Sequence, residues 1–481
     1  MKILYKIFLA TFLLSFMACN LDEEPFSFFA PENFYKNKRD AEAAIMAVYD
    51  SYQDDIVGLL HLSGAPTSQV IIEGTGTDVL DMLDWDAGEN IFYSFWQRCY
   101  VGINRANAAI DRIPQIEVLQ EDVANTLVAE ARFLRAGLYF DLIRVYGNVP
   151  FLDKETTDLE NVYPTNQNTT SQVWQLIIDD LLFAEIHLPE TRPNSERGRA
   201  TMWAAKGFLT KVYLQRSGLA KYNPFPERWG VAGVNEFSLA YQKAQEIIDS
   251  NQFELLDDYA SVFDLEFNKE RLFEIQYTSG GINEGSNLPM NTVPEGAIEG
   301  RAFGITRLSP DFLSEWEETD DRYERTWLLS YVSLLNGNEI SYPEVLEHPY
   351  CGKYRISDGL ETDNGANITL LRYADVLLMH AEAAMEAGTG NPYFGLNAIR
   401  LRAGKDALSG LSVDDLRMEI RKERKFELIM EFNDVFDVQR WGTLEEEAQQ
   451  AGYTYNSAYE LYPIPLREFD INPNLQQNPE Y

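Results

Sequence analysis

The residue with the clearest chemistry in this sequence is Cys19, whose thiol could carry a lipid. Lys2 and Lys6 precede an apolar run over residues 7–16, and Ala18 stands directly before the cysteine. A basic start, a short apolar segment and a small residue are the parts of a secretory signal. The apolar run is about ten residues long, which is too short for a helix that spans a bilayer. We therefore predict a cleaved signal peptide over residues 1–18.

The small residue followed by Cys19 resembles a bacterial lipobox. If it is one, Cys19 begins the mature chain and carries acyl chains, and residues 19–31 form a polar tether. The alternative is an ordinary cleaved signal with an incidental cysteine nearby. With the lipid in place, the protein is exported and held at a membrane by its anchor, with the rest of the chain in water.

Polar and aromatic side chains in the irregular segments are the candidates for binding a ligand. Carboxylates and amides exchange hydrogen bonds with sugar hydroxyls, and an exposed ring stacks on the C–H face of a pyranose. The alternative is that each tryptophan fills a gap in the core and each aspartate caps a turn. The predicted binding residues are Asp78, Asp81, Asp84, Trp85, Tyr93, Trp229, Tyr277, Asn283, Asn287 and Arg301.

Patterns typical of metal sites and catalysis are weak in this sequence. The four histidines (His61, His187, His348 and His380) are scattered without ligand spacing. The aspartates from Asp78 to Asp86 could hold a structural Ca²⁺ through oxygen atoms, but they lack an EF-hand pattern. Carboxylate pairs of the kind a glycoside hydrolase needs arise by chance among 76 acidic residues. We expect no catalytic residue, no metal site and no cofactor.

The charge balance excludes one class of partner. The 481 residues include 40 basic and 76 acidic ones, for a net charge of −36. Such a surface repels nucleic acid phosphates, so we expect no nucleic acid partner.

Besides Cys19, the sequence has two cysteines, Cys99 and Cys351. It allows either a disulfide between them or two buried thiols.

The elements that position these residues are predicted to be mostly helices, because the apolar residues recur with the period of a helix. Leu127, Ala131, Leu134 and Leu138 recur at steps of three and four, as on the buried face of a helix. The same pattern predicts helices over 125–146, 172–188, 200–216, 237–249, 370–387, 392–402 and 413–432. Gly218 is expected to close the third, Ser412 to cap the last, and 272–277 to form a short strand.

Paired helices with short turns predict a mainly α fold with tetratricopeptide-like hairpins, although no clean 34-residue repeat is present. Three irregular stretches separate the helices, over residues 61–90, 221–234 and 278–305. Loops this long in a compact protein are usually functional or disordered. We therefore expect the hairpins to support a loop-rich binding face.

Several motifs follow one another in a distinctive order. Trp96, Tyr100, Ile103 and Asn107 form a W-x3-Y-x2-I-x3-N segment, and further motifs occupy residues 130–150, 371–383, 397–404, 423–442, 461–465 and 477–479. Together with Cys19 this set resembles the SusD/RagB family of Bacteroidetes outer-membrane lipoproteins, over nearly the whole mature chain. Phe432, Asp434 and Glu480 depart from the family pattern. The charged motif residues, such as Arg132, Arg135, Glu423, Arg424 and Glu427, suit scaffold ion pairs.

The resemblance implies a non-catalytic lipoprotein of the cell outer membrane, exposed on the surface. Such proteins form a lid over a SusC-like TonB-dependent transporter, capture a glycan or oligosaccharide and pass it on. Two alternatives stay open: a lid that takes peptides, and a lipid-anchored glycoside hydrolase. The expected organisation is an N-terminal SusD-like helical region over 32–260 and a C-terminal RagB/SusD region over 261–481, packed as one globular unit.

Overall fold

The computed structural model describes residues 34–54, 56–65, 67–74, 80, 83–157, 162–281, 284–356, 358–359 and 362–481. The predicted signal peptide, the tether and Cys19 lie outside these residues. Within the described part of the chain, none of the helices combines the length and the apolar character that crossing a membrane requires.

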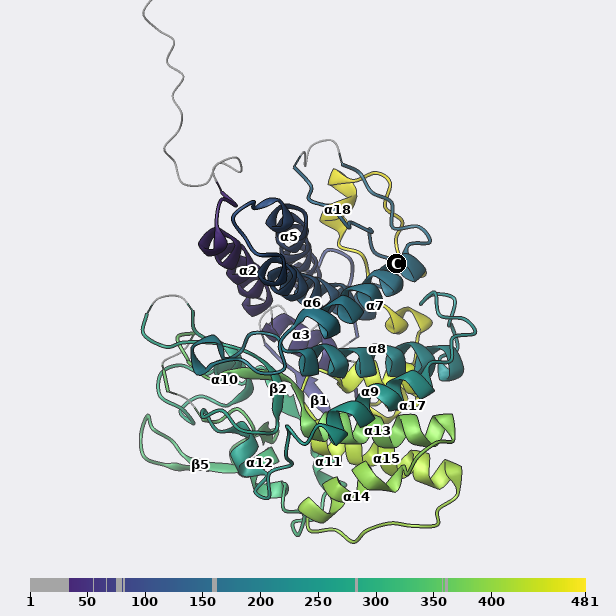
Figure 1. Ribbon diagram of the computed structural model, residues 1–481. Coiled ribbons are helices and arrows are strands. Elements are labelled where there is room, and N and C mark those ends of the chain that lie inside the picture. The colour runs from purple at the N-terminus through teal and green to yellow at the C-terminus, as the bar shows by residue number, and fades with distance from the viewer. Residues whose placement is uncertain are drawn as a thin grey trace, which may run out of the picture.

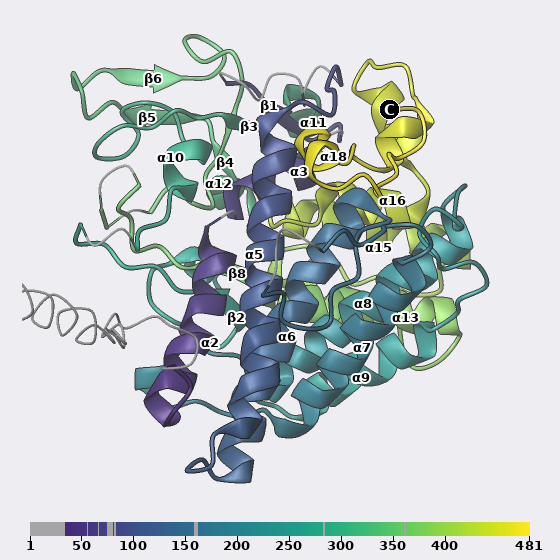
Figure 2. The same ribbon diagram turned by 90° about the horizontal axis from the view of Figure 1, so that it is seen from above.

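Helices make up most of the regular structure, and each long helix lies beside the next in space. In order, α5 packs on α6, α6 on α7, α7 on α8, α8 on α9 and α9 on α13, while α2 covers α5 and α6 (Figures 1 and 2). This arrangement confirms the mainly α fold with tetratricopeptide-like hairpins. The bounds are α2 Lys38–Gln53, α3 Ile56–Gly64, α5 Asn90–Arg112, α6 Glu121–Tyr146, α7 Thr170–His187, α8 Met202–Tyr222, α9 Phe237–Asp249, α13 Tyr373–Ala387, α14 Tyr393–Arg402, α15 Val413–Leu428, α16 Asp434–Trp441, α17 Leu444–Gln450 and α18 Leu466–Ile471.

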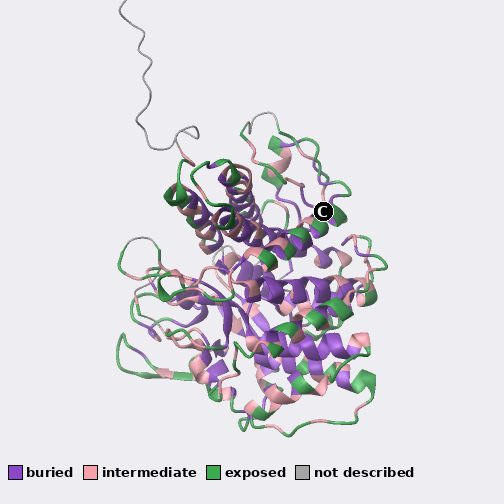
Figure 3. Ribbon diagram, in the orientation of Figure 1, coloured by how far each residue is buried: buried purple, intermediate pink, exposed green. Residues whose placement is uncertain are grey.

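The central helix α6 is buried over most of its surface because its neighbours cover it on several sides (Figure 3). Its buried charges are paired. Arg135 donates from Nε and Nη2 to the carboxylate of Asp180 on α7, at 2.7 and 2.8 Å. Paired charges of this kind hold two helices in one register, as the scaffold interpretation of Arg135 predicted.

Several predicted boundaries differ from the structure, three of them for a reason that the structure shows. Gly218 does not end α8; it lies inside the helix, where an added Cβ would meet the backbone oxygen of Arg440 at 2.8 Å. Residues 370–372 belong to a strand rather than to the start of α13. The helix α15 ends at Leu428, because Met430 and Phe432 adopt positive φ angles of 60° and 66°. The predicted cap is confirmed: Ser412 Oγ accepts from the Asp415 backbone N–H at 3.1 Å.

In the part of the chain that the structure describes, four small antiparallel sheets lie among the irregular segments, from the middle to the left of Figure 1. They pair β1 (Val70–Ile72) with β3 (Thr306–Leu308), β2 (Arg271–Ile275) with β8 (Ile368–Arg372), β4 (Trp327–Leu328) with β7 (Tyr350–Cys351), and β5 (Ser330–Val332) with β6 (Glu339–Ser341). Short helices among them are α10 Leu288–Thr292, α11 Pro310–Ser314 and α12 Tyr323–Thr326, and 3₁₀ turns cover Ile113–Gln115, Asn194–Glu196, Ala260–Phe263 and Ser457–Glu460.

A buried charge cluster joins these strands to the C-terminal helices. Arg372 at the end of β8 donates to Glu270 at 2.7 Å, to Glu427 at 2.6 Å and to Glu431 at 2.6 and 2.8 Å. Burial would raise the pKa of Glu427, but Arg402, Arg372 and Arg322 together hold that pKa below its ordinary value. Each charge in the cluster is therefore balanced, as a buried scaffold requires.

The two remaining cysteines are not joined by a disulfide. Cys99 lies on α5 and Cys351 on β7, and both are buried. Burial raises the pKa of Cys351 to about 11, so this thiol stays protonated at neutral pH. The structure thus favours two buried thiols over a disulfide.

Candidate functional site

The first and third irregular stretches meet in space and form one surface. The β1–β3 ladder joins them, and beyond it the Glu73 backbone N–H donates to Ile305 O at 2.9 Å. Glu73 also forms an ion pair with Arg307, and His348 lies 3.7 Å from the same carboxylate. We name this surface, made of residues 67–74, 284–309 and 327–351, the loop-rich face.

Within the loop-rich face, residues 287–304 form a tethered platform. The backbone N–H of Phe303 donates to Met290 O at 2.8 Å, and Ala302 N–H donates to the Glu295 carboxylate at 3.0 Å. The ring of Phe303 is 47% exposed, and the guanidinium carbon of Arg301 lies 5.1 Å from its centre. An exposed ring, with an exposed cation over one of its faces, is thus carried on a backbone that is fixed by hydrogen bonds.

The β5–β6 hairpin packs along this platform. Leu334 N–H donates to Gly296 O at 2.9 Å, and the hydroxyl of Tyr331 donates to Glu295 O at 2.9 Å. Its tip exposes three apolar side chains, those of Val332, Leu334 and Leu335, each more than half accessible. Neighbouring exposed apolar side chains of this kind mark surfaces that contact other molecules.

Two of the predicted binding residues lie in the core instead of on a surface. Trp229 has no exposed area, and its carbonyl accepts from Trp174 Nε1 at 2.9 Å. Trp85 is 8% exposed, packs against Tyr459 and Tyr462, and donates from Nε1 to the Tyr481 hydroxyl at 2.8 Å. Their rings fill the interior, so the structure corrects the prediction that they offer a face to a ligand.

The other predicted residues are spread over the surface. Asp84 is exposed, and Tyr93 is half-buried with the Arg467 guanidinium carbon 4.8 Å from its ring. Tyr277 is half-buried and donates its hydroxyl hydrogen to Gln53 O at 3.0 Å. Asn287 and the exposed Arg301 belong to the loop-rich face. Asp78, Asp81 and Asn283 lie outside the described residues.

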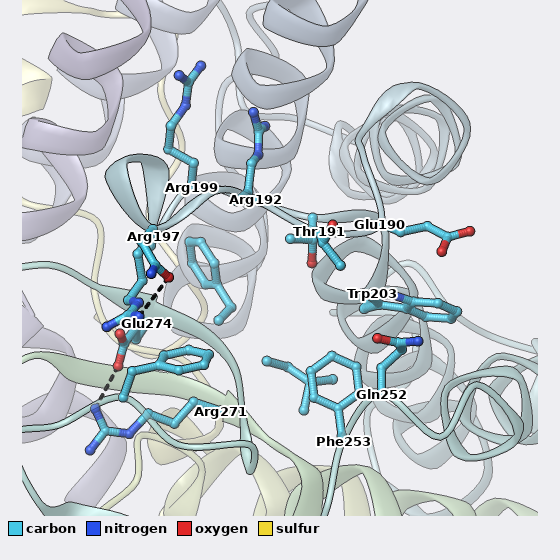
Figure 4. A pocket seen from close by; sticks show the side chains of 16 residues that line it. Glu190, Thr191, Arg192, Arg197, Arg199, Trp203, Gln252, Phe253, Arg271 and Glu274 are labelled. Atoms are coloured by element: carbon cyan, nitrogen blue, oxygen red, sulfur yellow. Dashed lines mark hydrogen bonds and ion pairs between the residues drawn. The ribbon is translucent and has the colours of Figure 1, made fainter.

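A feature that the sequence interpretation missed is a pair of adjoining cavities beside the segment 189–201, which links α7 to α8. We call this segment the linker. One cavity, of about 240 Å³, lies toward Trp203 and Phe253 (Figure 4). The other, of about 470 Å³, lies toward Tyr49 on α2 and Gln276. Arg197, Gly198 and Arg199 line both cavities and form the wall between them.

The linker is held in place by one buried carboxylate. Glu130 on α6 is fully buried; it accepts two hydrogen bonds from Arg199, at 2.8 and 2.6 Å, and lies 3.0 Å from Arg192. The hydroxyl of Tyr49 donates to the same carboxylate at 3.1 Å and accepts from the Ala200 backbone N–H at 2.8 Å. Burial and the charge of Glu130 raise the pKa of Tyr49 well above its ordinary value, so the phenol keeps its proton.

The cavities were missed because their walls come from distant parts of the sequence. Residues 190–203 supply one side and residues 252–274 the other. The sequence did contain one signal for a site at the cavities: three cations, Arg192, Arg197 and Arg199, lie close together in a strongly acidic chain.

Metal-ligating side chains do not gather in the described part of the chain: no three His, Cys, Asp or Glu residues there are placed to hold an ion. The Ca²⁺ alternative rests largely on Asp78 and Asp81, which the structure does not describe. Arginines, amides, hydroxyls and aromatic rings line the cavities, together with the carboxylates of Glu190 and Glu274 in one and of Asp50, Glu196 and Glu284 in the other. These groups suit hydrogen bonding and stacking with an organic ligand.

The fold defines a class of protein: a scaffold of tetratricopeptide-like hairpins that carries a loop-rich face. Comparison with known proteins agrees. A family model described as "SusD family" matches residues 347–481, and one described as "Starch-binding associating with outer membrane" matches residues 39–214, more than half of the chain between them. The chain belongs to the SusD/RagB family.

Individual relatives span the whole length. SusD-like protein P2 of Formosa agariphila is 28% identical, with 98% of this chain and 99% of that protein covered. The crystal structure of a SusD homolog from Bacteroides thetaiotaomicron superposes with a TM-score of 0.80 at 24% identity, covering 94% of this chain and 98% of the other. The surface glycan-binding protein A from the same organism, in complex with laminarihexaose, gives a TM-score of 0.76 at 20% identity and covers 92% and 99%.

Proposed function

We propose that this protein is a surface-exposed lipoprotein of the outer membrane that binds a glycan or oligosaccharide. Cys19 would carry the lipid, and the partner would be a SusC-like TonB-dependent transporter that receives the ligand. Membership of the SusD/RagB family supports the proposal, as do the likeness to a glycan-binding protein solved with laminarihexaose and the family description that mentions the outer membrane.

The observation that carries the proposal is the Arg301–Phe303 pair on the loop-rich face. The half-exposed ring of Phe303 can stack on the C–H face of a sugar, and Arg301 can donate to hydroxyl oxygens at the ring's edge. The backbone hydrogen bonds from Phe303 and Gly304 to Met290 O fix the backbone of the pair before any ligand arrives. A prearranged platform of this kind lowers the entropy lost on binding.

The remaining surface candidates extend this proposed site. Asn287 begins α10 in the same platform, and Asp78, Asp81 and Asn283 belong to the two irregular stretches that meet at the loop-rich face. Asp84, Tyr93 and Tyr277 are more distant candidates for an extended chain of sugars.

The exposed tip of the β5–β6 hairpin is the surface that we propose for the transporter. Val332, Leu334 and Leu335 offer apolar area that water solvates poorly, and burial against a partner would remove that cost. We further propose that the protein has no catalytic activity, and that residues 32–260 and 261–481 fold as one unit.

Gel electrophoresis of the purified mature chain through a panel of polysaccharides tests the function. Retarded migration on at least one glycan without released product is the expected result, and Phe303→Ala should weaken it about tenfold or more. Phe394→Ala, which removes an exposed ring from α14, is the matched control for loss of an exposed ring. Released oligosaccharide would establish a hydrolase, and binding to peptides alone would establish the peptide alternative; either outcome overturns the proposal.

A further inference from the structure

The cavity of about 240 Å³ beside Arg197 is a second binding site in our interpretation (Figure 4). We propose that it binds a sugar unit that carries a carboxylate, such as a uronic acid residue of an acidic glycan. This inference rests on the proposed function and adds to it a second site and a chemical selectivity. The cavity lies at the linker and not on the loop-rich face.

Arg197 is the residue that points to an anionic group. Its guanidinium carbon lies 4.8 Å from the centre of the Phe267 ring, and Nη2 donates to Asn194 Oδ1 at 3.0 Å. These two contacts hold the planar guanidinium in one orientation. Among the residues that the structure describes, no carboxylate oxygen comes within 4.0 Å of it. A fixed guanidinium with free N–H groups matches the two oxygens of a carboxylate.

The other arginines of the cavity are already neutralised. Arg192 and Arg199 share the buried carboxylate of Glu130, and both also pair with Glu196. Arg271 donates to Glu274 at 2.8 Å and to backbone carbonyls. Arg197 is therefore the arginine of this wall whose charge remains available to a ligand. Acidic side chains are abundant in this chain of net charge −36, yet none of the described ones pairs with the exposed guanidinium of Arg197.

The rest of the cavity suits a sugar ring. Phe253 and Phe267 are partly exposed aromatic rings, and Trp203, at the start of α8, lines the same cavity. The polar groups around them are the amides of Asn194 and Gln252 and the hydroxyl of Thr191, which donate to or accept from ligand hydroxyls. Apolar faces bordered by a few polar groups are typical of carbohydrate and small-molecule sites.

The charges also set an orientation. Glu190 and Arg197 lie on opposite sides of the cavity in Figure 4. Glu274, on the Arg197 side, is already paired with Arg271 at 2.8 Å, so a carboxylate on the ligand would be attracted to Arg197 and repelled from Glu190. The acidic group of the sugar therefore faces Arg197, and its hydroxyl edge faces Thr191 and Gln252.

Isothermal titration calorimetry on the mature chain tests this site, with an oligogalacturonate as the acidic probe and a neutral gluco-oligosaccharide as the comparison. Arg197→Ala and Phe267→Ala should each weaken binding of the acidic probe about tenfold or more, while any neutral binding stays unchanged. Arg197→Lys should recover only part of the affinity, because an ammonium lacks the two-point geometry. Arg39→Ala, which removes an exposed cation from the first turn of α2, is the control for net charge.

The outcomes separate the two proposals. Unchanged affinity of Arg197→Ala and Phe267→Ala for the acidic probe would overturn the second site, and Phe303→Ala would still report on the loop-rich face. An acidic peptide that binds as tightly as the oligogalacturonate would show that the ligand class is wrong. An absence of binding to every glycan, acidic or neutral, would instead overturn the proposed function itself. Thermal melting of each variant identifies any loss of affinity that comes from unfolding.

Discussion

Arg199 and Glu130 form a two-point ion pair, with Nε to Oε2 at 2.8 Å and Nη2 to Oε1 at 2.6 Å. The pair ties the linker to the central helix α6, and Tyr49 adds a hydrogen bond from α2 to the same carboxylate. Because Glu130 is fully buried, no ligand touches it. The wall between the two cavities is therefore positioned by a residue that takes no part in binding.

Glu130→Gln should lower the free energy of unfolding by about 2–4 kcal/mol, because it leaves the partly buried Arg192 and Arg199 without a buried counter-charge. Urea denaturation followed by circular dichroism measures the change. Glu121→Gln, at the exposed start of the same helix, is the control and should have little effect. Equal stability of the two variants would contradict a structural role for the Glu130 ion pairs.

Trp85→Ala should cost about 3–5 kcal/mol of stability, because it opens a cavity among Phe92, Tyr459 and Tyr462. The affinity of the folded fraction for glycans should not change, since the ring is buried. Comparison of the denaturation midpoint with the affinity at a temperature where both proteins are folded separates the two effects. Lower affinity at unchanged stability would restore Trp85 as a ligand contact.

Asp434 should make the protein less stable as the pH rises toward neutrality. Burial raises its pKa from 3.8 to about 7, and Oδ2 is buried without a hydrogen-bond partner. The folded state therefore keeps a proton that the unfolded chain releases, so stability falls as the pH rises from about 4 to about 7, by at most about 1.4 kcal/mol per pH unit.

Asp434→Asn should remove this loss and be more stable than the native chain at pH 8, with a smaller difference at pH 5. Denaturation midpoints across that range provide the measurement. Asp414→Asn, an exposed carboxylate on α15, should show no such pH-dependent gain. A difference between Asp434→Asn and the native chain that is constant with pH would argue against a raised pKa.

Gly218→Ala sets two opposing effects against each other. Alanine in place of glycine inside a helix gains about 1 kcal/mol from backbone propensity. Its Cβ, however, would lie 2.8 Å from the backbone oxygen of Arg440 on α16, and overpacking of this kind costs about 1–3 kcal/mol. We expect a net loss, seen as a lower melting temperature. A higher melting temperature would mean that α16 moves away at little cost.

The sequence predicted the helical frame well because its signals are local. The stripe from Leu127 to Leu138 and the cap at Ser412 depend on residues within a few positions of one another, and α6 and α15 begin close to where those signals indicate. Gly218 misled the prediction because its role depends on Arg440, which is brought close only by the packing of α16 on α8.

The candidate sites were harder to predict for the same physical reason. Whether Trp85 meets a ligand or the core depends on Tyr481, 396 residues away in sequence, and composition carries no information about that contact. Arg301 was identified from its loop, whereas the exposed ring beside it, Phe303, was not. The pairing of Arg197 with Phe267 likewise appears only when the linker folds onto the segment that precedes β2.

The contacts made by the C-terminal residues set an order on folding during synthesis. Asn478 donates to the Tyr146 carbonyl at the end of α6, across 332 residues, and Tyr481 receives the indole hydrogen of Trp85. A ribosome delivers the chain from its N-terminus, so α5 and α6 exist long before these partners do. The surface of α5 and α6 that these C-terminal residues cover therefore stays open until the end of the chain has arrived.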